Sequence, residues 1–158
     1  MTMAASAELR YEQTYRELSR DVFRFLLAWT NDWGAAEELT QETFLRLWQR
    51  RDTVDWTRPM IAWLLTTARR LANNRFRSLR RRARINLRPP ASLTDEGTRA
   101  RWLDVRGALD ELTPLERTAL ILTTVDGWPY AEAALLLRSS DGAVRSAVSR
   151  ARQKLERA

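Results

Sequence analysis

Apolar residues recur along this chain at intervals of three and four, the spacing that places them on one face of an α-helix. The clearest stripe steps by four, three, four, four and three residues, through Ile61, Leu65, Ala68, Ala72, Phe76 and Leu79. The alternation of apolar and polar residues that is typical of strands joined by hairpin turns is not evident. The pattern therefore predicts an all-α protein.

Capping residues and helix breakers predict where the helices begin and end. Asp32 is a candidate N-cap, Pro59 suits a first turn, and Thr113 to Glu116 has the form of a capping box with proline in the first turn. Gly127 is a natural C-terminal cap, and Ser140 is a plausible N-cap. We expect one helix or two abutting helices over residues 8–30, and further helices over 33–50, 59–84, 99–112, 114–126, 129–137 and 141–157.

Residues 86–98 are rich in turn-forming residues and include Pro89-Pro90 and Gly97. Such a composition ends the preceding helix and is typical of a linker. We therefore expect two small helical domains, at residues 1–85 and 99–158, each with a modest core.

The composition excludes much chemistry, because the 158 residues include no Cys and no His. No disulfide, thiol nucleophile, imidazole base, or zinc site built from Cys or His can form. The carboxylates are not tied to a phosphate-binding loop, a metal-ligand set or a nucleophile motif, so we expect no enzyme, no metal and no cofactor. The longest apolar run, 60–65, is far short of a membrane span, and no secretory signal is visible, so a cytoplasmic protein is expected.

The net charge of +7 is spread very unevenly, and 26 of the 27 basic residues are Arg. Residues 69–88 contain nine Arg and no acidic residue, and residues 134–158 carry a net charge of +4, whereas the remaining segments are acidic. Two separate basic blocks indicate two anion-contacting surfaces, and Arg is a good bidentate ligand of phosphate and guanine. Solvated helix faces or codon bias are the alternative explanations.

Two short helices joined by a tight turn near residue 138, the second of them basic, describe a helix-turn-helix. On the last helix, short polar and basic side chains lie opposite or beside the apolar stripe of Val144, Val148, Ala151 and Leu155. They are Arg145, Ser146, Ser149, Arg150 and Gln153. Such a face suits the major groove of DNA. The alternative is an amphipathic closing helix with a soluble outer face.

A second polar face lies opposite the apolar stripe of the helix that begins near Pro59. It consists of Trp63, Arg70, Asn74, Arg77 and Arg81. An aromatic ring at the head of a basic face suits single-stranded DNA, because the ring can stack on a base while the guanidinium groups follow the backbone. Burial of Trp63 against the first helix is the alternative.

The helix over 33–50 has an inner side formed by Ala36, Thr40, Thr43 and Leu47. Facing away from it are Glu38, Gln41, Glu42 and Leu45, with Trp48 at the flank. An exposed Leu and Trp beside carboxylates favour a binding site for a partner helix. Packing of both residues on a neighbouring helix is the alternative.

Three stretches in order resemble the extracytoplasmic-function (ECF) sigma factors, which are small bacterial sigma subunits of RNA polymerase. Residues 36–48, Ala-Glu-Glu-Leu-Thr-Gln-Glu-Thr-Phe-Leu-Arg-Leu-Trp, are similar to the polymerase-binding segment of the family's region 2. Residues 62–72 resemble its promoter-melting segment. Residues 112–117, 126–132 and 142–155 are similar to region 4, so the resemblance covers nearly the whole chain.

The resemblance implies a protein that binds core RNA polymerase, directs it to promoters and helps to open the DNA. The region-4 helix-turn-helix would read the −35 element as duplex, and region 2 would capture the melted −10 element. In the family, the loop that corresponds to residues 51–58 holds a flipped-out promoter base. The resemblance therefore makes Asp52, Asp55 and Trp56 candidates for binding this base. Family members are often held by an anti-sigma protein, so the expected partners are core polymerase, promoter DNA and such a protein, with no membrane.

The chain departs from the family pattern at several positions. Arg70 and Asn74 stand where Asn and Asp are usual, and both changes make the DNA-facing side less acidic or more basic. Arg138 replaces a usual Gly and Ser139 a usual apolar turn residue, which leaves the geometry of the turn open. Ala147 stands where a basic residue is common. A rival interpretation is a stand-alone helix-turn-helix regulator whose N-terminal helices form a dimerisation or effector domain.

Overall fold

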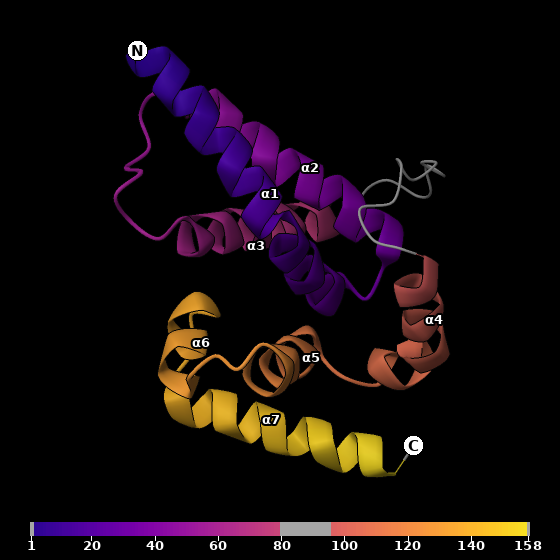
Figure 1. The fold of residues 1–158 in the computed structure, drawn as a ribbon. Coiled ribbons are helices and arrows are strands. Elements are labelled where there is room, and N and C mark those ends of the chain that lie inside the picture. Colours follow the sequence, from indigo (N-terminus) through magenta and orange to yellow (C-terminus); the bar gives the residue numbers. More distant parts are fainter. Residues whose placement is uncertain (1, 80–95, 158) are drawn as a thin grey trace. The chain divides into compact units, whose positions relative to one another are not determined.

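The computed structural model describes residues 2–79 and 96–157, and these residues are almost entirely helical, as predicted (Figure 1). The elements are α1 (Met3–Thr30), α2 (Trp33–Gln49), α3 (Met60–Leu79), α4 (Glu96–Asp110), α5 (Pro114–Leu120), a π-helical turn (Ile121–Val125), α6 (Tyr130–Leu136) and α7 (Asp141–Glu156). Most of the predicted linker lies outside the described residues. Its last three residues belong to α4, which begins three residues before the predicted start near Arg99.

The described residues form two compact units. The first contains residues 2–26 and 34–79, and the second contains residues 27–33 and 96–157.

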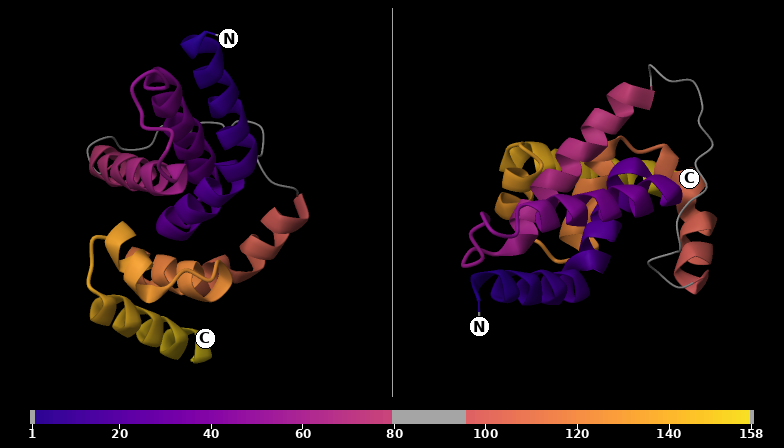
Figure 2. Two further views of the ribbon diagram at one scale, coloured as in Figure 1. Left: turned by 60° about the vertical axis from the view of Figure 1, so that its left-hand side comes forward. Right: turned by 90° about the horizontal axis from the view of Figure 1, so that it is seen from above.

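The first unit is built on α1 and α2, which lie side by side, and on α3, which crosses them (Figures 1 and 2). The predicted inner side of α2 is fully buried: Ala36, Thr40, Thr43 and Leu47 are all at 0% exposure. The two threonine hydroxyls can be buried because each donates a hydrogen bond of 2.7 Å to a carbonyl of the preceding turn. The helix thereby presents its opposite face, which carries the candidate partner site, to solvent.

The second unit holds α7 against α5 and α6 (Figure 2). Val144, Val148 and Ala151 are buried as the stripe predicts, and Leu155 is half-buried. Both N-caps predicted in this unit are confirmed. Thr113 Oγ1 accepts from the Glu116 backbone N–H at 3.2 Å, and Ser140 Oγ accepts from that of Ala143 at 3.0 Å. These caps fix where α5 and α7 begin.

The helix predicted over 114–126 changes its winding part of the way along. It is an α-helix only to Leu120 and continues as the π-helical turn, with the Asp126 N–H donating to the Ile121 carbonyl at 3.0 Å. The segment ends at Gly127, whose φ of +72° is readily adopted only by glycine. The predicted stop is therefore confirmed, but the sequence pattern gave no sign of the π-turn.

Candidate nucleic-acid and partner interfaces

The first unit contains an open cleft of about 680 Å³ between the loop after α2 and the first half of α3. Three of the predicted DNA-binding residues, Asp55, Trp63 and Arg70, line it together. Arg58, Thr66 and Thr67 also line the cleft and were missed by the sequence analysis. The two threonines follow Trp63 by three and four residues, so helical spacing alone could have placed them on its face.

Asp55, which lines this cleft, is held in a defined orientation. Its Oδ1 accepts hydrogen bonds from the Thr57 backbone N–H at 3.0 Å and from the Thr57 hydroxyl at 2.5 Å, and Arg58 lies 3.5 Å from Oδ2. The hydrogen bonds from Thr57, followed by the charge of Arg58, hold the pKa of Asp55 below its ordinary value. The side chain is therefore an ionised hydrogen-bond acceptor at neutral pH.

Trp63 is partly exposed, whereas its neighbours Leu64 and Leu65 are buried. Its side chain thus lines the cleft, whereas Leu64 and Leu65 pack in the core of the first unit. Arg70 and Asn74 are exposed further along α3. Arg77 belongs to α3, but its side chain lies outside the described part of the structure, as does the whole of Arg81.

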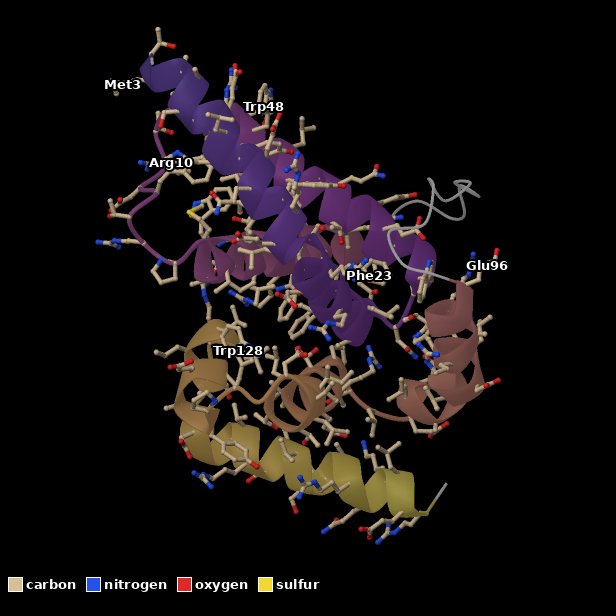
Figure 3. The ribbon with its side chains drawn as sticks, in the orientation of Figure 1. Met3, Arg10, Phe23, Trp48, Glu96 and Trp128 are labelled. Atoms are coloured by element: carbon tan, nitrogen blue, oxygen red, sulfur yellow. The ribbon has the colours of Figure 1, made fainter. Side chains whose placement is uncertain are left out.

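Trp56 does not join the cleft. Its indole N–H donates to the Arg51 carbonyl at 2.9 Å, and its ring lines a different cavity of about 300 Å³. Arg10, labelled in Figure 3, and Asp52 line the same cavity. Asp55 therefore lines the cleft beside α3, whereas Asp52 and Trp56 line the smaller cavity. A loop has no periodic pattern from which this difference could be predicted.

The predicted partner face of α2 is only partly free. Gln41, Glu42 and Leu45 are exposed, with Leu45 at 52%. Glu38 is half-buried and forms an ion pair with Arg75 of α3. The exposed part of this face is thus a short patch around Glu42 and Leu45, in which Arg46 lies 3.8 Å from the Glu42 carboxylate.

Trp48 lies at the edge of this patch and is partly covered by its own chain (Figure 3). Its ring meets Tyr11 of α1 edge-on at 5.0 Å, and the guanidinium carbon of Arg51 lies 3.9 Å from the ring centroid. The ring therefore packs on α1, as the alternative interpretation expected, and leaves part of its surface exposed.

The turn between α6 and α7 keeps a regular geometry despite its unusual residues. Arg138 adopts a φ of +50°, the Ser139 N–H donates to the Ala134 carbonyl at 2.8 Å, and the Arg138 N–H donates to the Leu135 carbonyl at 3.3 Å. These are the two hydrogen bonds of a Schellman motif, in which glycine is the usual left-handed residue. The helix-turn-helix is thus formed with an arginine in the glycine position.

All five candidate DNA-contacting residues of α7 are exposed: Arg145, Ser146, Ser149, Arg150 and Gln153. The Arg145 Nε lies 2.5 Å from Asp141, and its guanidinium carbon lies 4.4 Å from the Tyr130 ring centroid. The hydrogen bond to Asp141 raises the pKa of Arg145. Ala147 is fully buried, so a basic residue there could not reach DNA from this helix without disturbing the core.

Arg150 forms an ion pair with Glu116, a residue predicted only as part of a cap. Its Nε lies 3.8 Å from Oε1 of Glu116, and the Lys154 ammonium lies 2.9 Å from Oε2. Burial raises the pKa of Glu116, but hydrogen bonding and charge from Lys154, with hydrogen bonds from Thr113, outweigh it and leave the pKa below its ordinary value. The buried carboxylate is therefore ionised at neutral pH.

Comparison with known proteins identifies the family of this chain. The models for Sigma-70 region 2 and for Sigma-70 region 4 match residues 14–82 and 102–155. The ECF RNA polymerase sigma factor SigC of Mycobacterium tuberculosis is 35% identical over 149 residues, which cover 91% of this chain and 80% of that protein. SigL of the same species is 33% identical over 153 residues, covering 90% and 85% of the two chains.

A solved structure shows the same fold. The sigma factor RpoE of Bartonella quintana, in complex with the anti-sigma factor NepR, superimposes with a TM-score of 0.71 and 25% identity over 93% of this chain and 94% of that one. Fold and sequence together define a two-domain helical sigma subunit of the sigma-70 class. The chain belongs to the ECF RNA polymerase sigma factors, which act in transcription initiation.

Within the described ranges, none of the helices is both long and apolar enough to cross a membrane.

Proposed function

We propose that this sigma factor reads the −35 element as duplex DNA with α7 and captures the melted −10 element in the cleft beside α3. The observation that carries the proposal is the convergence of Trp63, Asp55 and Arg70 on one open cleft. Such a cleft can accept an unstacked base on the Trp63 ring, offer Asp55 to an exocyclic amino group and place Arg70 near a phosphate.

Duplex reading by α7 is supported by the geometry of the helix-turn-helix. The Schellman turn leads directly into α7, whose small exposed residues, Ser146 and Ser149, allow close approach to the major groove. Arg145 and Arg150 flank these serines, and either can form paired hydrogen bonds with guanine or contact phosphate. Gln153 extends the same face by one turn.

The rest of the proposal concerns protein partners. The exposed patch at Gln41, Glu42 and Leu45, with Trp48 at its edge and Glu38 behind it, is proposed to dock on core RNA polymerase, in the cytoplasm where transcription occurs. Because the related RpoE was solved with an anti-sigma factor, we also propose that this chain is sequestered by a protein of that kind. As an initiation factor it has no catalytic role of its own.

Reconstitution with core polymerase tests the function as a whole. The expected result is promoter-specific transcription only when both components are present, with mapped start sites that share upstream elements at −35 and −10. The rival interpretation, a dimeric stand-alone regulator, predicts tight sequence-specific binding by the free protein and no association with core. That result would overturn the proposal.

Charge reversal at Glu42 tests the polymerase-docking patch. Glu42→Lys places a cation where we propose a complementary basic partner, so affinity for core should fall by about tenfold. Fluorescence anisotropy with labelled sigma factor measures this affinity directly. Glu12→Lys on α1 is a matched control, because Glu12 is also an exposed helical glutamate of the first unit but lies outside the patch. Equal affinity for the two variants would contradict the assignment.

A further inference from the structure

Glu116 lies outside α7, yet its carboxylate forms ion pairs with two basic side chains of that helix, Arg150 and Lys154. We propose that Glu116 is a positioning residue for recognition of the −35 element, orienting Arg150 and Lys154 for duplex DNA. This inference rests on the proposed function of α7, and it identifies the residue that orients the Arg150 side chain. The contacting groups would come from one helix and their orientation from another.

The contact geometry supports this role. Glu116 lies in the first turn of α5, and its side chain is only 5% exposed. The Lys154 ammonium lies within 3.1 Å of both carboxylate oxygens, at 3.1 Å from Oε1 and 2.9 Å from Oε2, and Arg150 Nε lies 3.8 Å from Oε1. Arg150 and Lys154 are four residues apart, so one carboxylate spans one turn of α7.

Glu116 is not used as a capping-box glutamate alone. In the usual motif, the glutamate side chain satisfies the N-terminus of its own helix. Here Thr113 caps the Glu116 N–H, and the carboxylate of Glu116 accepts hydrogen bonds from Thr113 and also contacts two cations on α7. A buried carboxylate is costly unless it is paired, so its burial and the placement of the two cations depend on each other.

The arrangement also leaves Arg150 able to read a base. Its side chain is 54% exposed, and the contact with Glu116 is made through Nε. The two terminal nitrogens can then form the fork that pairs with the two acceptors of guanine. Restricting a long side chain before binding lowers the entropy that must be lost in forming the complex. Lys154, with a further contact of 3.4 Å to the Glu111 carbonyl, completes the anchor.

The test uses holoenzyme assembled from core polymerase and either the full chain or its Glu116→Gln variant. Initiation is measured on a cognate promoter and on a set carrying single −35 substitutions. We expect Glu116→Gln to lower discrimination at the base pair read by Arg150 by at least about fivefold, because a bidentate contact loses its fixed direction. Glu116→Asp, which keeps the charge, should restore part of the discrimination.

Two controls separate positioning from folding. Glu96→Gln makes the same chemical change at an exposed glutamate of the second unit that lies outside this cluster, and it should leave discrimination unchanged. A template with a pre-opened −10 region and no −35 element requires only the first unit, so Glu116→Gln should equal the wild type on it. Equal losses on every template would show a structural role and overturn the inference.

The remaining outcomes are also decisive. If the wild type distinguishes −35 sequences and Glu116→Gln does so equally well, the inference fails and the proposed function stands. If the wild type itself is indifferent to the −35 sequence, the duplex-reading function fails and the inference fails with it.

Discussion

The candidate arginines of α7 and Arg70 of the cleft beside α3 differ in whether a carboxylate of the same chain lies beside them. On α7, Arg145 and Arg150 lie beside carboxylates of their own chain, Asp141 and Glu116. On α3, Arg70 is exposed at the cleft and forms no ion pair with any residue that the structure describes. The stretch 69–88 around it contains no acidic residue.

This difference matches what each surface would have to recognise. Base edges in a duplex groove occupy fixed positions, so an arginine that reads them gains from being oriented in advance. A melted strand is flexible and can adapt to the protein, so stacking on an aromatic ring and unrestrained cations suffice. Preorganised arginines on α7 and a free Arg70 at the cleft are therefore consistent with one duplex site and one single-strand site.

The largest expected effect comes from removing the aromatic ring of the cleft. Trp63→Ala should reduce open-complex formation by about 10-fold to 100-fold, since base–aromatic stacking is worth roughly 1–3 kcal/mol. Permanganate reactivity of melted thymines measures this opening.

A template that is already mismatched across the −10 region provides the critical comparison for Trp63. If the ring serves mainly to capture bases as they unstack, pre-opening the DNA should recover much of the loss, and Trp63→Phe should retain most of the activity. A defect that is also seen with unaltered severity in core binding would instead indicate a misfolded first unit.

Removing Arg150 from α7 should weaken recognition of the −35 element. Arg150→Ala is expected to cost about 1–3 kcal/mol at a single −35 base pair, with little change at the others. Transcription from single-substitution promoters measures this, and pre-opening the −10 region should not compensate for it. Unchanged promoter selection by the variant would rule out a base contact by Arg150.

The turn that orients α7 offers a stability test. Arg138→Gly should stabilise the chain by about 1 kcal/mol, because the left-handed conformation of Arg138 is strained for a residue with a Cβ atom. Arg138→Ala removes the same charge and keeps the Cβ, so it should show no such gain. Thermal unfolding followed by circular dichroism compares the two, and equal midpoints would argue against strain at this position.

The smallest expected effect is on the salt dependence of promoter binding, which compares the free Arg70 with the paired Arg145. Arg70→Ala should lower the slope of log affinity against log salt concentration by about one, because a free guanidinium neutralises a phosphate fully. Arg145→Ala should lower it by less, since Asp141 already compensates part of that charge. Promoter binding by holoenzyme over a salt series provides both slopes. A larger change for Arg145 would reverse the comparison.

Features set by local sequence were predictable. The spacing of apolar residues identified the buried sides of α2 and α7, and the caps at Thr113 and Ser140 formed where their local sequence indicated. Both depend on residues within one or two turns of each other, where helical geometry leaves little freedom. Trp63, Arg70 and Asn74 were assigned to a solvent-facing side of α3 for the same reason, and they are partly or fully exposed.

Contacts between distant residues needed the tertiary structure. Periodicity could not show that the loop after α2 turns Asp55 into the cleft and Trp56 away from it, because a loop has no repeating geometry. It could not show that Glu116 reaches across to Arg150, since 34 positions separate them and only packing of α5 on α7 joins them. The sequence alone thus determined which residues face outward on each helix, and tertiary packing decided which of those residues meet.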